Sequence, residues 1–303
     1  MMKNLSYLIG ILITIAIGTY LYFTLCSSCH LAMAEKVPVQ EDVAPIAAPE
    51  PSSFPFAISD GNYTFNVNDN FNFNLSSNTV LMPLSADVKN GVDSLKGYLT
   101  ANSDKVIDIT GLYGSDEENP TAFPNLGLAR ANTVKNYLVS QGVSSAQTNT
   151  FGKLMDDLVP SENKLLGPVT YAISQSSETA EEDLKALYEE IKANPLVLYF
   201  SSGEAAINLT TEQRQKVANI TKYLDKVENA TCNVIGHTDN TGGRINNITL
   251  GQERADFAMA YLIRNGIPAS KIRSNSEGPD NPIATNATEE GRSKNRRTVV
   301  TLN

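Results

Sequence analysis

Two stretches of the chain carry the same pattern about 125 residues apart, and this repeat restricts the fold to two copies of one module. Repetition of ordered matches at a nearly fixed period indicates a duplicated structural unit. We call residues 54–174 module one and residues 196–303 module two. At a shift of 125 positions, Ser76-Ser77 matches Ser201-Ser202, Tyr98-Leu99 matches Tyr223-Leu224, and Gly111 matches Gly236. At a shift of 124, Leu126-Gly127, Arg130-Ala131 and Gly142-Val143 match Leu250-Gly251, Arg254-Ala255 and Gly266-Ile267.

Module two alternates between strand and helix patterns. Thr210 and Gln213 have the spacing of a capping box, which predicts a helix from this point. A second helix is predicted over residues 252–264, with Gly251 before it and Gly266 as its C-cap. A short apolar run predicts a strand at residues 196–200, and further strands are predicted at residues 231–235, near residues 271–275 and at residues 298–302. This order predicts an α+β fold of two tandem β/α/β/α/β modules, each a mixed sheet with helices on one face.

The segments outside the modules have distinct compositions. Residues 1–30 are predicted to be an N-terminal membrane anchor. Residues 31–53 are rich in Pro and Ala, which is typical of an extended spacer. Residues 175–195 are strongly charged with apolar residues at helical spacing, which predicts a connecting helix with one docked face.

Residues 7–25 contain no charged side chain. A helix of this length spans ~28 Å, close to the thickness of a bilayer's hydrocarbon core. The length favours an uncleaved transmembrane helix in the lipid bilayer, and therefore a single-pass inner-membrane protein with periplasmic domains. The alternatives are a cleaved signal peptide and a lipoprotein acylated at Cys26 or Cys29, which would place the chain in the outer membrane.

The composition excludes several classes of function. The chain has a formal net charge of −9, so it is predicted to be a poor nucleic-acid binder, because phosphate contacts need clustered Lys and Arg. It contains only two histidines, and no nucleophile–base set stands near either of them. We therefore expect no catalytic residues, no metal site and no cofactor, and the chain is predicted not to be an enzyme.

A turn-forming segment, Gly236-His237-Thr238-Asp239-Asn240-Thr241-Gly242, carries a carboxylate that lies 15 residues before Arg254. A carboxylate accepts hydrogen bonds from an ammonium group, and a guanidinium offers a planar fork to a carboxylate. Asp239 and Arg254 together could grip a zwitterion, such as an amino-acid head group. The alternative is that the two residues only form a salt bridge between loop and helix.

Module two resembles the OmpA-like C-terminal domain family over residues 197–303. The resemblance rests on the Asp239 loop, on Leu250-Gly251 with Arg254-Ala255, and on the Asn295-Arg296-Arg297 end. It implies non-enzymatic binding of peptidoglycan, with Asp239 and Arg254 holding the diaminopimelate of the stem peptide. It also implies that Thr238, Asn247 and Arg296 line the pocket; the alternative for Asn247 is a turn residue.

Module one resembles the family only in outline, over about residues 66–174. Gly114 stands at the position of Asp239, whereas Arg130 corresponds to Arg254. Without a carboxylate at that position, module one is not expected to bind the same ligand. It is interpreted as a spacer or as a docking surface for an envelope protein.

These features favour a tether that joins a membrane to the cell wall of a Gram-negative-type envelope. The alternative is a structural adaptor of a larger envelope, secretion or motility complex, with module one as the docking surface. A MotB-type stator is disfavoured because residues 7–25 include no acidic side chain to carry an ion. A cell-wall hydrolase is disfavoured because no catalytic set is found.

Overall fold

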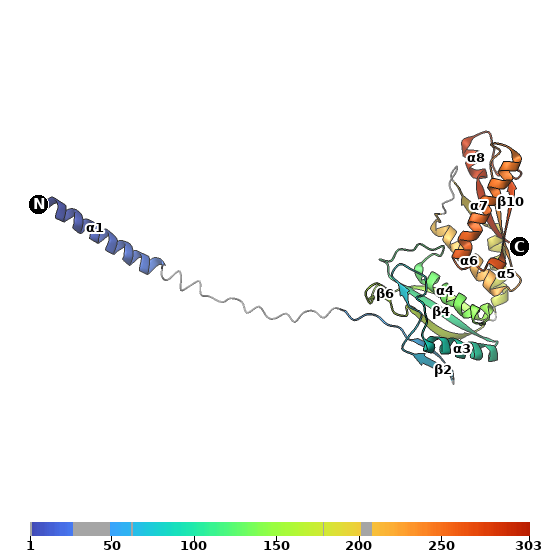
Figure 1. The fold of residues 1–303 in the computed structure, drawn as a ribbon, viewed down its shortest axis with the longest axis horizontal. Helices are drawn as coiled ribbons and strands as arrows, with labels where there is room; N and C mark the ends of the chain where they lie inside the picture. Colours follow the sequence, from blue (N-terminus) through green and yellow to red (C-terminus); the bar gives the residue numbers. More distant parts are fainter. Residues whose placement is uncertain (1, 27–48, 62, 178, 201–207) are drawn as a thin grey trace. The chain divides into compact units, whose positions relative to one another are not determined.

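The computed structural model describes residues 2–26, 49–61, 63–177, 179–200 and 208–303 (Figure 1). It divides the chain into two units, Met1–Pro49 and Glu50–Asn303. In the first unit, helix α1 covers Met2–Leu21 and a π-helical turn covers Tyr22–Cys26. Residues 31–48 of the predicted linker 31–53 lie outside the described residues, as does Cys29, one of the two cysteines in the lipoprotein alternative.

The membrane anchor predicted for residues 7–25 is not supported by the structure. In the described part of the chain, no helix combines the length and the apolar character that crossing a membrane requires. The uncharged segment is divided between α1, which ends at Leu21, and the π-helical turn that follows it.

The second unit begins at Glu50, a few residues before the predicted start of module one at residue 54. The backbone N–H of Ser52 donates to the carbonyl of Val159 at 2.8 Å, and Ser53 forms a bridge with Leu166. These backbone bonds fix the end of the predicted linker to module one, although its composition is that of a spacer.

Module two is built on a four-stranded sheet with the strand order β10-β9-β11-β8. Strand β9 is parallel to β10 and antiparallel to β11, so the sheet is mixed as predicted. The strands cover Leu196–Tyr199 (β8), Cys232–His237 (β9), Ile272–Gly278 (β10) and Arg297–Leu302 (β11). The helices cover Thr211–Lys226 (α6), Arg244–Arg264 (α7) and Glu289–Asn295 (α8), and a 3₁₀ turn covers Ala269–Lys271.

The capping box at the start of α6 forms as predicted. The Thr210 hydroxyl accepts from the N–H of Gln213, and the Gln213 side chain accepts from the N–H of Thr210. Val217, Ile220 and Leu224 then follow at helical spacing and are buried in the core of module two. Local capping and the apolar stripe therefore agree on the position of this helix.

Helix α7 begins eight residues earlier than predicted, at Arg244 instead of residue 252. Its N-cap is Gly243, which forms no side-chain cap, so the usual sequence signal for a helix start is absent. Asn247 is therefore in the first turn of the helix and not in the preceding loop. Arg254 lies in the third turn, so the prediction of a first-turn arginine with Gly251 as N-cap was wrong.

Module one repeats the central strand arrangement of module two. Strand β4 is parallel to β5 and antiparallel to β7, as β9 is to β10 and β11. The strands of this sheet cover Lys105–Tyr113 (β4), Thr148–Leu154 (β5) and Val169–Gln175 (β7). Its helices cover Ala86–Ala101 (α3) and Leu126–Ser140 (α4), with a 3₁₀ turn at Ser145–Gln147. Phe56–Asp60 (β1) pairs with Tyr63–Val67 (β2), and Phe73–Asn74 (β3) pairs with Lys164–Leu165 (β6).

The same close contact between a strand glycine and a helix glycine occurs in both modules. A Cβ atom at Gly236 in β9 would lie 1.9 Å from the carbonyl oxygen of Gly251 in α7. A Cβ atom at Gly111 in β4 would lie 2.0 Å from the carbonyl oxygen of Gly127 in α4. Only glycine allows the helix backbone to approach the sheet this closely. The repeated sequence pattern therefore preserves one helix-on-sheet contact.

The predicted connecting helix forms as α5, Ala180–Ala193. Ile191 is buried in the core of module two, and Leu187 and Tyr188 pack against that core. Module one has its own apolar core, built around β4, α3 and α4. Contacts also join the two modules: Lys135 Nζ lies 2.5 Å from Asp225 Oδ2. Whether each predicted domain folds separately stays a prediction, because residues 50–303 form one unit.

Candidate ligand-binding site

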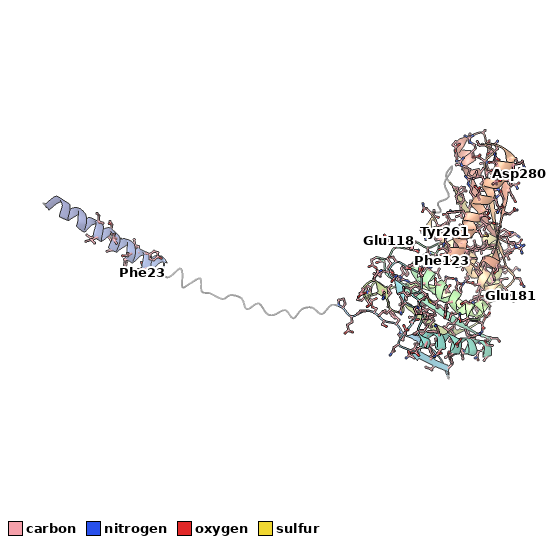
Figure 2. All side chains as sticks on the ribbon, in the orientation of Figure 1. Phe23, Glu118, Phe123, Glu181, Tyr261 and Asp280 are labelled. Carbon is pink, nitrogen blue, oxygen red and sulfur yellow. The ribbon has the colours of Figure 1, made fainter. Side chains whose placement is uncertain are left out.

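A pocket of about 560 Å³ lies at the end of β9, between the start of α7 and helix α8. All five residues predicted for the site line it. The complete lining consists of Thr238, Asp239, Thr241, Asn247, Leu250, Arg254, Glu289, Arg292 and Arg296. Figure 2 shows the side chains of this part of the chain, with the labelled Asp280 just past the end of β10.

Asp239 is held in place by hydrogen bonds to both of its carboxylate oxygens. Oδ2 accepts from Arg296 Nη1 at 2.9 Å, and Oδ1 accepts from the backbone N–H of Thr241 at 2.9 Å. The preceding Thr238 is fixed because its backbone N–H donates to the carbonyl of Gly278 in β10. The loop therefore presents a buried, ordered carboxylate to the pocket.

Arg254 is buried without a matching acceptor. The residue is only 6% exposed, and its Nη1 has no hydrogen-bond partner among the described residues. The guanidinium carbon lies 5.8 Å from the centre of the Phe200 ring. Burial, together with the positive charge of Arg296, lowers the pKa of Arg254. An unsatisfied buried N–H costs free energy, so binding of a hydrogen-bond acceptor to this nitrogen would be strongly favourable.

Arg296 lies between two carboxylates. Besides the bond to Asp239, its Nη2 donates to Glu289 Oε1 at 2.7 Å. Glu289 also accepts from Arg292, whose Nη1 donates to the carbonyl of Asn286. Arg297, the next residue, is buried and donates to the carbonyl of Asn281 instead. The two consecutive arginines therefore point to different surroundings, as expected for neighbouring residues where a strand begins.

The predicted pair does not form an ion pair of its own. Among the described residues, the partner of Asp239 is Arg296, and no salt bridge joins Asp239 to Arg254. The alternative of a simple loop-to-helix salt bridge is therefore wrong. Asn247 lines the pocket and also has a structural contact, because its Nδ2 donates to the carbonyl of Thr241 at 3.1 Å.

Sequence reasoning missed four pocket residues: Thr241, Leu250, Glu289 and Arg292. Glu289 and Arg292 lie on α8, a seven-residue helix that was not predicted. The Thr288 hydroxyl accepts from the N–H of Gly291 and caps this helix, with Glu289 and Glu290 in its first turn. These are recognisable helix-start signals, but no apolar stripe follows them.

His237 and Cys232 do not line the pocket but are buried in the structure that supports it. The imidazole of His237 is buried at the end of β9, and burial together with the charge of Arg297 lowers its pKa. Cys232 is fully buried in the core, where burial raises the pKa of its thiol to about 12. Cys232 is therefore a small apolar residue of the core.

Replacing Asp239 with Asn is expected to reduce the loss of stability in acid. Burial disfavours the charged carboxylate, but the hydrogen bonds from Arg296 and Thr241 outweigh it, so the pKa of Asp239 lies below 3.8. A lowered pKa contributes stability that is present above the unfolded-state pKa and is lost as pH falls through the folded-state pKa. Urea unfolding should show that wild type exceeds Asp239→Asn in free energy of unfolding by a constant amount between about pH 7 and 5, and by less below about pH 4. If the difference in free energy of unfolding between the two proteins stayed unchanged down to about pH 3, this would contradict the Arg296–Asp239 bond.

Module one contains a counterpart of this site that is already filled. Arg130 forms two bonds to the carboxylate of Glu117, one of them between Nη1 and Oε2 at 2.9 Å. Gly114 stands in the place of Asp239, as the sequence comparison indicated, but Glu117 reaches Arg130 from three residues further along the loop. The absence of binding of the same ligand by module one stays a prediction.

Comparison with known proteins supports the resemblance found in module two. The model of the OmpA family matches residues 199–296. Residues 199–296 form an OmpA-family domain. This match lies within module two, so a degenerate second copy at about residues 66–174 stays a prediction, consistent with the repeated strand arrangement.

Relatives of this OmpA-family domain include two curated proteins. The probable lipoprotein YiaD of Escherichia coli is 44% identical over 86 residues, which are 28% of this chain and 39% of that protein. The peptidoglycan-binding protein ArfA of Mycobacterium tuberculosis is 34% identical over 121 residues, which are 40% of this chain and 36% of that protein. The chain therefore spans less than half the length of either relative.

One solved structure that the chain matches is the C-terminal domain of Helicobacter pylori MotB. The match has 29% sequence identity and a TM-score of 0.31. It covers 36% of this chain and 84% of the MotB domain.

Proposed function

We propose that the OmpA-family domain binds peptidoglycan and recognises the diaminopimelate of the stem peptide in the pocket between α7 and α8. The observation that carries the proposal is the buried Arg254 guanidinium, whose Nη1 finds no acceptor among the residues that the structure describes and which stands in the same pocket as the Asp239 carboxylate. Relatives of the domain support it, since ArfA is named a peptidoglycan-binding protein. The chain then acts as a non-enzymatic protein of the cell envelope.

The pocket suggests a role for each charged group. The Arg254 guanidinium would receive the ligand carboxylate, because a planar fork of N–H donors matches its two oxygens. Asp239 would accept from the ligand ammonium. Arg296 occupies one oxygen of Asp239 in the free protein and would keep Glu289 as its partner after exchange. Thr238 and Asn247 hold the loop and helix that carry Asp239 and Arg254.

Sedimentation of the full chain with purified sacculi tests the proposal. Wild type is expected to sediment with the sacculi, and free diaminopimelate should release it. Cadaverine is the matched competitor, because it carries the same chain and both amino groups but lacks both carboxylates, and it should release far less. The double variant Asp239→Ala/Arg254→Ala should stay in the supernatant. Equal sedimentation of wild type and this variant would show that the assigned pocket does not bind the wall.

A second candidate is a structural adaptor in which module one docks an envelope protein. The observation that favours it is the edge strand β5, on which Phe151 is 49% exposed and Leu154 is 48% exposed. Apolar side chains on an unpaired strand edge are typical of a surface that adds a partner. Cross-linking from position 151 separates the two functions, because a tether alone would yield no protein adduct.

A further inference from the structure

The Arg130 side chain in module one is completely enclosed and fully satisfied. Its residue has 0% exposure, and the side chain of its partner Glu117 is only 3% exposed. Arg130 Nη1 also donates to the carbonyl of Leu112 at 2.8 Å, and Nε donates to the carbonyl of Ser77 at 3.0 Å. This guanidinium therefore differs from that of Arg254, whose Nη1 has no acceptor within the described ranges.

The Glu117 carboxylate is held in the way that a bound carboxylate would be. Oε1 accepts from the backbone N–H of Ser76 at 2.9 Å, and Oε2 accepts from the backbone N–H of Gly114 at 3.0 Å. Each oxygen also accepts from one terminal nitrogen of Arg130. A two-pronged arginine contact with two backbone donors is a complete receptor for one carboxylate.

The framework around this receptor repeats that of the Arg254 pocket. Each arginine follows a helix glycine by three positions, and that glycine touches the equivalent strand glycine of its own sheet. Each guanidinium also lies near a phenylalanine ring. The guanidinium carbon of Arg130 is 5.7 Å from the centre of the Phe73 ring, and that of Arg254 is 5.8 Å from the centre of the Phe200 ring. The two arginines therefore occupy equivalent places, one with a carboxylate bound and one without.

We infer that module one retains a carboxylate-binding site whose ligand is its own Glu117. The loop that carries Glu117 supplies in cis the group that an external ligand would bring, and it thereby closes the site to other carboxylates. The site and its internal ligand concern module one alone and do not depend on what the pocket of module two binds.

A small carboxylate added from outside tests this inference. Glu117→Ala removes the side chain from Cγ outward, and these atoms match one acetate ion. The variant should melt about 10 °C below wild type, because Arg130 is left buried without its partner. Sodium acetate at about ten times its Kd should raise the Tm of the full-length variant by about 3–6 °C above sodium chloride of equal ionic strength. Wild type should show no such difference between the two salts.

Three further variants decide the outcome. Glu118→Ala is the matched control, because Glu118 is the exposed neighbour labelled in Figure 2, and it should not respond to acetate. Glu117→Gln keeps the site filled and should not respond. Glu117→Ala/Arg130→Met lacks the receptor and should not respond. If Glu117→Ala does not fold in chloride, its refolding yield should rise in acetate. The absence of any acetate effect on Glu117→Ala, or an equal effect on the Arg130→Met double variant, would overturn the inference.

Discussion

Arg254→Met is expected to weaken binding of the full chain to sacculi by about 100-fold or more. Loss of one partner from a buried, hydrogen-bonded charge pair typically costs ~2–5 kcal/mol of binding free energy, and each 1.4 kcal/mol is about tenfold in Kd. Methionine keeps most of the length of the side chain and removes the guanidinium. Binding isotherms with sacculi measure the change. The matched control is Arg264→Met, which removes an exposed arginine from the last turn of the same helix.

The same substitution should leave the folded protein at least as stable as wild type. Arg254 Nη1 is buried without a partner in the described part of the chain, so its removal deletes an unsatisfied donor and not a bond. Thermal unfolding of Arg254→Met should therefore give a Tm equal to or above that of wild type. Lost wall binding together with a markedly lower Tm would indicate that Arg254 supports the fold and that its assignment to the ligand is wrong.

Gly236→Ala is expected to reduce the free energy of unfolding by about 3 kcal/mol, the upper part of the usual range for overpacking. The added Cβ would lie 1.9 Å from a backbone oxygen of α7, and the whole helix must shift to relieve that contact. Gly111→Ala should have a similar effect in module one, where the corresponding distance is 2.0 Å. Urea unfolding monitored by circular dichroism measures both changes.

Gly97→Ala is the matched control for both glycine variants. Gly97 lies on the exposed side of α3, and a Cβ atom there would meet nothing within 4 Å. Alanine is favoured over glycine inside a helix by about 1 kcal/mol, so this variant should be slightly stabilised. If Gly236→Ala behaved like Gly97→Ala, the close approach of α7 to β9 would not be a requirement of the fold.

The sequence predicted the elements whose signals are local. The Thr210 capping box and the apolar stripe behind it identify α6 without further information. The start of α7 was missed because its Gly243 cap has no side chain, and the Asn246-Asn247 pair is common in turns. Helix α8 was missed because seven polar residues carry no periodic signal.

The candidate site was predicted as a set of residues, but its internal contacts were not. Resemblance to a family assigns positions, whereas the bond between Arg296 and Asp239 joins residues 57 positions apart and depends on the packing of α8. Glu117 was missed for the same reason. The aligned position holds Gly114, and only the path of the loop shows that a longer side chain from residue 117 reaches Arg130.

The contact of Arg296 with Asp239 has a consequence for selectivity in an environment rich in small cations. The Asp239 carboxylate is already neutralised by the Arg296 guanidinium, which is also bonded to Glu289. A metal ion or a simple amine must first displace that guanidinium, so its affinity for Asp239 is low. A molecule that carries both charges can compensate for that displacement through its carboxylate on Arg254. On the proposed function, the resting pocket would therefore discriminate against molecules that carry only one of the two charges.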